Sequence, residues 1–373
     1  MRAWPVLVIS IIQVILFLAH WFMFHTWISF WPGSVAAPHP DLRIALFALS
    51  FTFVAASLLS FRIWNWAVGL FYRLAALWLG FAHFFFLAAC LTWPVWYAMR
   101  VLAPAQAAAA RPAIGAGFFL AALATSLYGL VNARMIRVRR IAVRLPNLPE
   151  SWRGRRAVLM SDLHLGNVNR ARFVRRMVAL AAGFEPDIVF LPGDVFDGTY
   201  ADFDRLVAPF KDLKPPFGVY FATGNHEEFH DTALYLAAIA RTGIQVLANQ
   251  RVTVDGLHIL GISYHEAAHP QRVRATLESL SPGANQASIL LNHAPMRLPI
   301  VEEAGIGLQL SGHTHGGQIV PFNWLTRRIF GKFTHGLHRF GALQVYTSTG
   351  AGTWGPPMRV GTTPEIVVLT FEF

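Results

Sequence analysis

The sequence lacks a second cysteine, and its first third is nearly without acidic residues. Cys90 has no partner among the 373 residues, which excludes a disulfide framework within the chain and fits a reducing compartment. Up to Ala133 there are six arginines and one acid, Asp41, and residues 134–144 add five arginines and no acid. The rest is nearly balanced, with 20 basic and 19 acidic residues. The net charge of +11 therefore arises from the hydrophobic first third and from residues 134–144 that follow it. No basic nucleic-acid-binding face is evident.

Long runs without any charged side chain make up most of the first third. They cover residues 3–40, 44–61, 74–99 and 112–133. Each is long enough for a helix of roughly 20 residues across the hydrocarbon layer, and tryptophans gather near the ends, where indoles prefer the interface. Four buried helices of a soluble core are the alternative, but such helices rarely lack charge over whole spans. The sequence predicts a transmembrane region of about four helices over residues 1–133.

The arginines after the fourth run predict how the helices are oriented across the membrane. The stretch "RMIRVRRIAVR", residues 134–144, is expected to stay on the cytoplasmic side, and an even number of crossings places the N-terminus there too. Three scattered histidines within the runs, His20, His25 and His83, are interpreted as packing or interface residues, although an ion path is conceivable.

After a basic juxtamembrane linker at residues 134–150, the hydrophobic pattern of the sequence changes. Short apolar runs such as "RAVLMSD", "DIVFLPGD" and "ASILLNHA" read as buried strands, and they alternate with amphipathic stretches such as 170–182. Strands that alternate with helices predict a layered α/β domain over residues 151–373.

Polar residues cluster where these expected strands end, in "SDLHLG", "GDVFDG", "GNHE", "NH" and "GHTH". In such folds ligands collect beyond the carboxyl ends of the strands. His313 and His315 stand two residues apart between glycines, and in extended backbone both imidazoles would face one point. Each piece alone is weak, since D-x-H arises by chance and a lone histidine is more often structural. Together they predict a ligand set of Asp162, His164, Asp194, Asn225, His293, His313 and His315.

Carboxylate, amide and imidazole ligands suit Mn, Fe or Zn better than Ca. Seven side chains exceed what one ion needs, so we expect two divalent ions that share a bridging carboxylate. Such a pair lowers the pKa of a water and neutralises charge that builds on a phosphoryl oxygen. The chemistry that this pattern predicts is phosphoester hydrolysis.

With these five blocks, the sequence resembles the calcineurin-like metallophosphoesterases from about Ser161 to Phe373. The resemblance implies a two-sheet αββα sandwich, here preceded by the four-helix transmembrane region. It also implies the ligand roles: Asp162, His164 and His315 hold one ion, Asn225, His293 and His313 hold the other, and Asp194 bridges them. His226 would act on the phosphate as the catalytic residue. Asp197 would orient a ligand or His226.

The "GGQ" after His315 and the tail "GTWGPPMRVGTTPEI" look like a membrane-associated branch of that family. That likeness implies an integral protein of the bacterial inner membrane whose partners are the bilayer and a lipid-linked phosphate substrate such as UDP-diacylglucosamine. A general phospholipid or cell-envelope phosphodiesterase is the alternative, and a transporter or sensor with a regulatory metal domain is another. Arg359 in this tail is expected to contact substrate phosphate or to form a structural ion pair.

Two further stretches carry hypotheses. "HEAAH", residues 265–269, matches a zinc-protease motif, but Pro270 disfavours helical backbone at His269, so we expect a polar loop beside the cleft. The stretch 321–333, "PFNWLTRRIFGKF", interleaves aromatic and basic residues. It suits a membrane interface as well as it suits a loop that covers the core.

Overall fold

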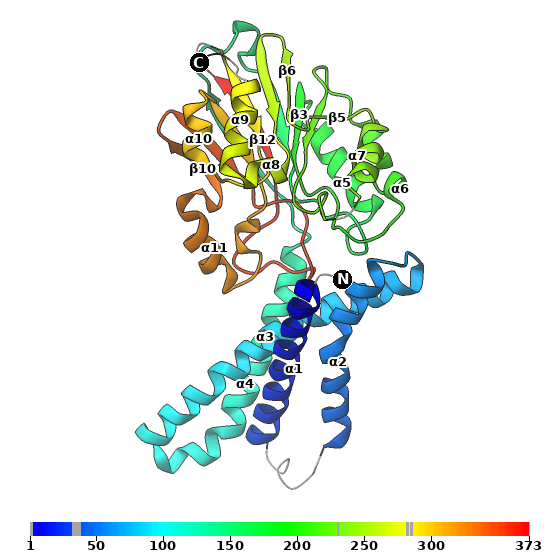
Figure 1. Ribbon diagram of the computed structural model, residues 1–373. Helices are drawn as coiled ribbons and strands as arrows, with labels where there is room; N and C mark the ends of the chain where they lie inside the picture. Colours follow the sequence, from blue (N-terminus) through cyan, green and yellow to red (C-terminus); the bar gives the residue numbers. More distant parts are fainter. Residues whose placement is uncertain (1–2, 32–38, 230, 281–282, 284–285, 373) are drawn as a thin grey trace. The chain divides into compact units, whose positions relative to one another are not determined.

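The computed structural model describes residues 3–31, 39–229, 231–280, 283 and 286–372. Contacts divide the chain into two units, and each is described by itself (Figure 1). The helical unit comprises Met1–Val131 with Gly355–Met358, and the sandwich unit comprises Asn132–Trp354 with Arg359–Phe373.

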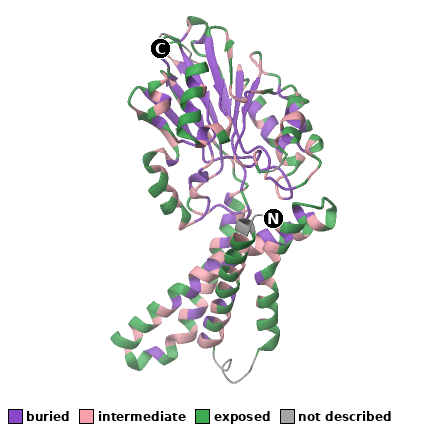
Figure 2. Ribbon diagram, viewed as in Figure 1, coloured by how far each residue is buried: buried purple, intermediate pink, exposed green. Residues whose placement is uncertain are grey.

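The helical unit is built from four helices. These are α1 (Ala3–Phe30), α2 (Pro40–Ser60), α3 (Trp66–Leu102) and α4 (Pro104–Asn132). All four contain a stretch that is long and apolar enough to cross a membrane, in agreement with the charge-free runs. Helices α2, α3 and α4 begin earlier than those runs, because arginine is a good helix former and does not end a helix. Much of their surface is exposed, as expected of helices that face lipid (Figure 2).

Two histidines of the helical unit, His20 and His25, contact aromatic side chains of neighbouring helices, and of these His20 is buried. His20 contacts a backbone carbonyl one turn earlier through Nδ1, and its Nε2 accepts a hydrogen bond from the Trp78 indole at 2.9 Å. The His25 ring stacks on Trp21 of its own helix and on Trp93 of α3, with centroid distances of 5.7 and 5.8 Å. Both rings therefore join neighbouring helical surfaces, as the packing interpretation predicted.

The sandwich unit contains two six-stranded mixed sheets. The first has the order β1-β12-β2-β3-β4-β5 and the second β10-β11-β9-β8-β7-β6. The strands of the first sheet are β1 (Arg137–Arg144), β12 (Glu365–Glu372), β2 (Arg156–Leu159), β3 (Ile188–Pro192), β4 (Val219–Ala222) and β5 (Gln245–Val246). Those of the second are β10 (Gly336–Phe340), β11 (Leu343–Thr347), β9 (Leu308–Ser311), β8 (Ser288–Leu291), β7 (Leu257–Gly261) and β6 (Gln250–Val254).

Three apolar layers hold the sandwich together. The layer between the sheets joins residues of both, such as Phe190 of β3 and Leu310 of β9. Helices α5 (Ala171–Ala182), α6 (Phe203–Val207) and α7 (Thr232–Ala240) cover the first sheet. Helices α9 (Pro270–Leu280) and α10 (Leu298–Glu303) cover the second. This arrangement confirms the αββα sandwich that the sequence predicted (Figure 1).

The stretch 134–150, described above as a linker, contributes a strand to the first sheet. Strand β1 pairs in parallel with β12, from Arg137 opposite Glu365 to Arg144 opposite Glu372. Arginines occupy four of its eight positions, and Val143 is fully buried in the layer between the sheets. The high arginine content hid this strand, because arginines on an exposed edge strand leave only a few apolar positions to read.

Candidate metal centre

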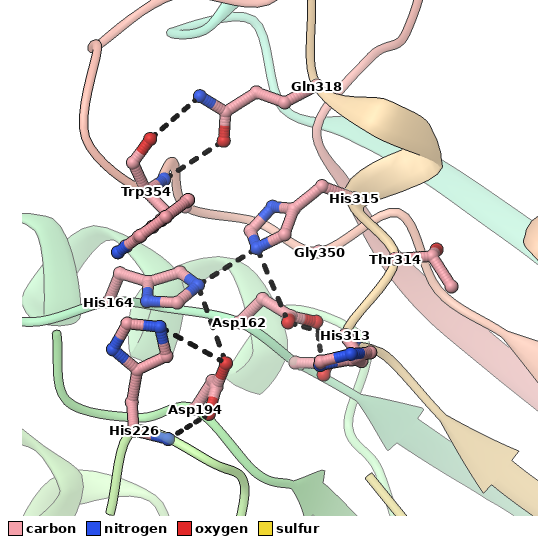
Figure 3. Close-up of polar contacts among 12 residues, drawn as sticks. Asp162, His164, Asp194, His226, His313, Thr314, His315, Gln318, Gly350 and Trp354 are labelled. Carbon is pink, nitrogen blue, oxygen red and sulfur yellow. Dashed lines mark hydrogen bonds and ion pairs between the residues drawn. The ribbon is translucent and has the colours of Figure 1, made fainter. Parts of the chain in front are cut away.

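The five polar blocks meet at one edge of the sandwich unit. They follow β2, β3 and β4 of the first sheet and β8 and β9 of the second. Because these strands are parallel within each sheet, their carboxyl ends lie together. The side chains of Asp162, His164, Asp194, His226, His313 and His315 converge there (Figure 3). The convergence that the sequence predicted is present in the structure.

Asp194 lies at the middle of the cluster. Its Oδ2 atom is 3.1 Å from His293 Nε2, 3.8 Å from His164 Nε2 and 4.0 Å from His226 Nε2. Its Oδ1 accepts a hydrogen bond from the backbone N–H of His226 at 3.0 Å. One buried carboxylate therefore belongs to two groups of side chains that could each hold an ion, one with His164 and His226 and the other with His293 and His313.

A further group, which shares His164 with one of these, consists of Asp162, His164 and His315. The Nε2 atoms of the two histidines are 2.9 Å apart, and His315 Nε2 is 3.5 Å from Asp162 Oδ1. Burial lowers the pKa of both histidines well below the usual value, so both rings are neutral at pH 7. Neutral imidazole nitrogens that face each other across such a short distance suit a shared cation.

The second group brings Asn225, His293 and His313 to the other side of Asp194. His313 Nδ1 is 3.0 Å from Asn225 Oδ1 and 3.2 Å from His293 Nε2. His293 Nδ1 contacts the carbonyl of Pro192 at 2.7 Å, which leaves Nε2 facing the centre. A carbonyl that orients a histidine in this way is the usual outer partner of a metal ligand. The donor set and its orientation thus fit a divalent ion.

Charges within the centre compensate one another. Burial alone would raise the pKa of Asp194, but His293, which is hydrogen-bonded to it, lowers it. Conversely, burial alone would lower the pKa of His293, and Asp194 raises it. Burial, with repulsion from Asp194, raises the pKa of Asp162 to about 6. Two buried carboxylates so close together therefore need positive charge between them, which divalent cations supply.

Five of the candidate ligands have left-handed backbone. Their φ angles are 54° at Asp162, 47° at His164, 53° at Asp194, 70° at His313 and 49° at His315. Side chains other than glycine rarely adopt this conformation, at a cost of about 1–3 kcal/mol each, and it concentrates at functional sites. The expectation that His313 and His315 share extended backbone and face one point was wrong. With both twisted, His313 faces His293 while His315 faces His164.

His226 and Asp197 are joined through the backbone. The Nδ1 atom of His226 contacts the carbonyl oxygen of Asp197 at 2.8 Å, so its Nε2 faces the centre. The Asp197 carboxylate instead accepts hydrogen bonds from the backbone N–H and the hydroxyl of Thr199 and from the N–H of Asn167. Asp197 thus orders the loop after β3 and orients His226, although through its carbonyl rather than its carboxylate.

Glu227 is a residue whose role the sequence analysis missed. It is fully buried and accepts hydrogen bonds from the backbone N–H groups of Asp194, Phe196 and Gly224 at 2.8–3.0 Å. Burial, and then the nearby Asp194, raises its pKa to about 7. In the sequence, the only indication of a role for Glu227 is its position directly after "GNH". The backbone groups that it binds lie close to it only in the folded structure.

Arg359 is fully buried, and its two terminal guanidinium nitrogens donate to groups within the protein, whereas its Nε has no partner among the described residues. It donates to the carbonyls of His315, Gly350 and Gly352, and NH2 lies 3.2 Å from His315 Nδ1. These contacts differ from both roles that the sequence suggested, substrate contact and an ion pair. They hold the loop at residues 350–352 against His315.

The "HEAAH" stretch is a short helix where a polar loop was expected. Helix α8 (Tyr264–Ala268) ends before His269, which has φ −105° and ψ 118°. Pro270 then begins α9. His269 therefore leaves the helix, as the proline predicted, and the motif lacks the continuous helix that a zinc protease requires.

Comparisons with known proteins agree with this geometry. The model of the calcineurin-like phosphoesterase family matches residues 155–317. A transmembrane protein with metallophosphoesterase domain from Bos taurus is 31% identical over 303 residues, 76% of this chain and 67% of that protein. An uncharacterized metallophosphoesterase of Campylobacter jejuni is 31% identical over 66% of each chain. One of Helicobacter pylori is 31% identical over 57% of this chain and 58% of that protein.

The chain belongs to the calcineurin-like phosphoesterase family. The match confirms the family predicted from the five blocks, and the described part of the chain has four helices long and apolar enough to cross a membrane. The chain spans 58–67% of the length of these three relatives.

Proposed function

We propose that the protein is a membrane-anchored phosphoesterase with two metal ions that hydrolyses a phosphodiester or pyrophosphate bond of a lipid-linked substrate. UDP-diacylglucosamine is the leading example. Residues 1–133 provide the anchor and residues 151–373 the catalytic domain. The observation that carries the proposal is the shared position of the buried Asp194, whose carboxylate belongs to two groups of possible metal ligands.

In this proposal Asp162, His164 and His315 would hold one ion, Asn225, His293 and His313 would hold the other, and Asp194 would serve both. The nitrogen and oxygen donors suit Mn, Fe or Zn. Bound ions would supply positive charge that lowers the pKa of a water and offsets charge building on the phosphoryl oxygens.

His226 serves as the catalytic side chain of the protein itself. Because its Nδ1 is held by the Asp197 carbonyl, its Nε2 is directed towards the centre and available to the phosphate. Nε2 donates a hydrogen bond to a phosphoryl oxygen, or a proton to the leaving oxygen, when the ring is protonated.

The lipid-linked substrate is supported by helix α11 (Phe322–Phe330). None of its residues is buried, and Trp324 and Ile329 are 71% and 64% exposed. Arg327 and Arg328 lie in its last turn. Exposed apolar side chains beside cations suit an interface with anionic headgroups. The ring of Phe330, at the end of α11, lies 6.1 Å from that of His313, so this surface reaches the metal centre.

The catalytic domain faces the cytoplasm of a bacterium in this proposal, because five arginines follow the last apolar run. A green fluorescent protein fused after Phe373 should then fluoresce. Alkaline phosphatase at the same place, which needs an oxidising compartment for its disulfides, should stay inactive. The reverse pattern would place the domain outside the cytoplasm.

The activity is tested with the full-length protein in detergent. With added Mn²⁺ it should release p-nitrophenolate from bis-p-nitrophenyl phosphate. Asp194→Asn should lower this rate by more than about a hundredfold, which exceeds the loss of activity seen when a residue that only supports a metal ligand is replaced. Asp204→Asn is the matched control, because Asp204 forms an exposed ion pair with Arg241. A panel of lipid phosphates and nucleotide-lipids, read by mass spectrometry, then identifies the substrate. An Asp194→Asn variant as active as Asp204→Asn would refute the two-ion centre.

A further inference from the structure

Trp354 is held in place by Gln318. The Gln318 side chain accepts a hydrogen bond from the Trp354 N–H and donates one to the Trp354 carbonyl, both at 2.9 Å (Figure 3). Gln318 itself is nearly buried, and its N–H donates to the carbonyl of His315 at 3.1 Å. The glutamine of the "GGQ" stretch therefore fixes the backbone of Trp354 relative to a candidate metal ligand.

The indole of Trp354 is exposed although it lies beside the metal centre. The residue is 58% exposed, and its ring centroid is 5.9 Å from that of His226. Phe229, 55% exposed, lies with its ring centroid 4.7 Å from the same histidine. Large aromatic rings that stay in contact with water add little to the folded state. The exposed rings of Trp354 and Phe229, both beside the His226 ring, therefore indicate a surface that binds a ligand.

The shape of these side chains selects the kind of group that fits. Aromatic rings bind other flat rings by offset stacking or edge-to-face contact. Stacking of a nucleobase on an aromatic side chain is tolerant of sequence, because every base has a π-face. A phosphate at the metal centre would bring a ring attached to it within reach of this surface, since His226 borders both.

We propose that Trp354 and Phe229 form a subsite for a planar ring, such as a nucleobase, carried by one of the two groups attached to the phosphorus. Gln318 is its positioning residue. The proposal rests on the phosphoesterase function above and assigns the residues that bind the ring of a nucleotide-containing substrate, the class to which UDP-diacylglucosamine belongs. Apolar α11 lies near His313, so the planar group and the lipid would contact different histidines of the centre.

The test compares two ligands that differ by the ring alone. Uridine 5′-monophosphate and ribose 5-phosphate are titrated into the full-length, Mn²⁺-loaded protein, and binding is measured by calorimetry without any turnover. The nucleotide should bind at least about fivefold more tightly, the lower limit for one stacked base. In Trp354→Ala this preference should fall below about twofold, while the Kd of ribose 5-phosphate stays unchanged. Trp354→Phe should retain most of it, and Gln318→Ala should reduce it.

Leu234→Ala, which removes an exposed apolar side chain from α7, is the matched control and should keep the full preference. Equal binding of the two ligands to the wild-type protein would overturn the subsite alone. The same holds if the preference survives in a Trp354→Ala, Phe229→Ala double variant. If neither ligand binds, the phosphate-binding centre itself is refuted together with the subsite.

Discussion

The carboxylate of Glu227 holds the backbone of Asp194. Its Oε2 atom accepts hydrogen bonds from the N–H of Asp194 at 3.0 Å and of Gly224 at 2.8 Å, and Oε1 accepts from Phe196 at 2.9 Å. Asp194 has a φ of 53°, which an aspartate seldom adopts without support. The acid of "GNHE" therefore supports the conformation that directs the central carboxylate into the centre.

Replacing Glu227 with glutamine should weaken metal binding. A glutamine amide has one carbonyl oxygen, so in either orientation its NH₂ group would face at least one N–H donor, and each buried donor left unpaired costs about 1–3 kcal/mol. We expect the Mn²⁺ affinity of Glu227→Gln, measured by calorimetry, to fall about 10–100-fold, as for other outer partners of metal ligands. The melting temperature should fall as well.

Glu228→Gln is the matched control for that experiment. Glu228 accepts hydrogen bonds from the Thr223 hydroxyl and the His265 N–H, each at 2.6 Å, and supports the loop without contacting Asp194. Its Mn²⁺ affinity should stay close to that of the wild-type protein. Equal losses in the two variants would show that Glu227 only stabilises the fold.

The sequence allowed the strands and the polar blocks after them to be predicted, because both depend on local patterns. A fully buried strand such as β3 reads as a continuous apolar run, and "GDVFD" follows it directly. The parallel order of β2, β3 and β4 then brings distant blocks together. A layered α/β domain and the candidate ligands could therefore be inferred before any coordinates, whereas the two-sheet αββα sandwich was implied by the family resemblance.

Features that depend on tertiary contacts could not be predicted in this way. The left-handed backbone at His313 and His315 could not be predicted, because the local enrichment of histidine at positive φ is too weak to identify particular positions. The hydrogen bonds between the Gln318 side chain and the Trp354 backbone join residues 36 positions apart. Strand β1 has an interpretable pattern only once β12 is known to lie beside it.

Gly312 is expected to tolerate no side chain. A Cβ there would lie 1.9 Å from the Ser161 hydroxyl oxygen and 2.2 Å from Asp162 Oδ2, so Asp162 must move. Gly312→Ala should therefore carry less Mn per chain than the wild-type protein, measured by elemental analysis, and should lose about 1–3 kcal/mol of stability. Gly117→Ala in α4, where no atom lies within 4 Å of the added Cβ, should retain its Mn. Full Mn content in Gly312→Ala would contradict the assignment of Asp162.

Glu266 should be dispensable for phosphoesterase activity. Its side chain contacts the exposed His265 and Arg272 at 3.7 and 3.5 Å, and α8 ends before His269. Glu266→Gln should hydrolyse bis-p-nitrophenyl phosphate at close to the wild-type rate. Complete loss of turnover would instead reopen the zinc-protease interpretation of "HEAAH".

Helix α11 should determine how well the enzyme uses a substrate with long acyl chains. Trp324 and Ile329 are exposed on this helix, and serine at both positions removes apolar surface that would insert among lipids. We expect the ratio of kcat/KM for a long-chain lipid substrate to that for its short-chain, water-soluble analogue to fall about tenfold or more in the Trp324→Ser, Ile329→Ser variant. Leu234→Ser removes an exposed apolar side chain from α7 and should leave the ratio unchanged. An unchanged ratio in the α11 variant would mean that this helix makes no contact with the lipid.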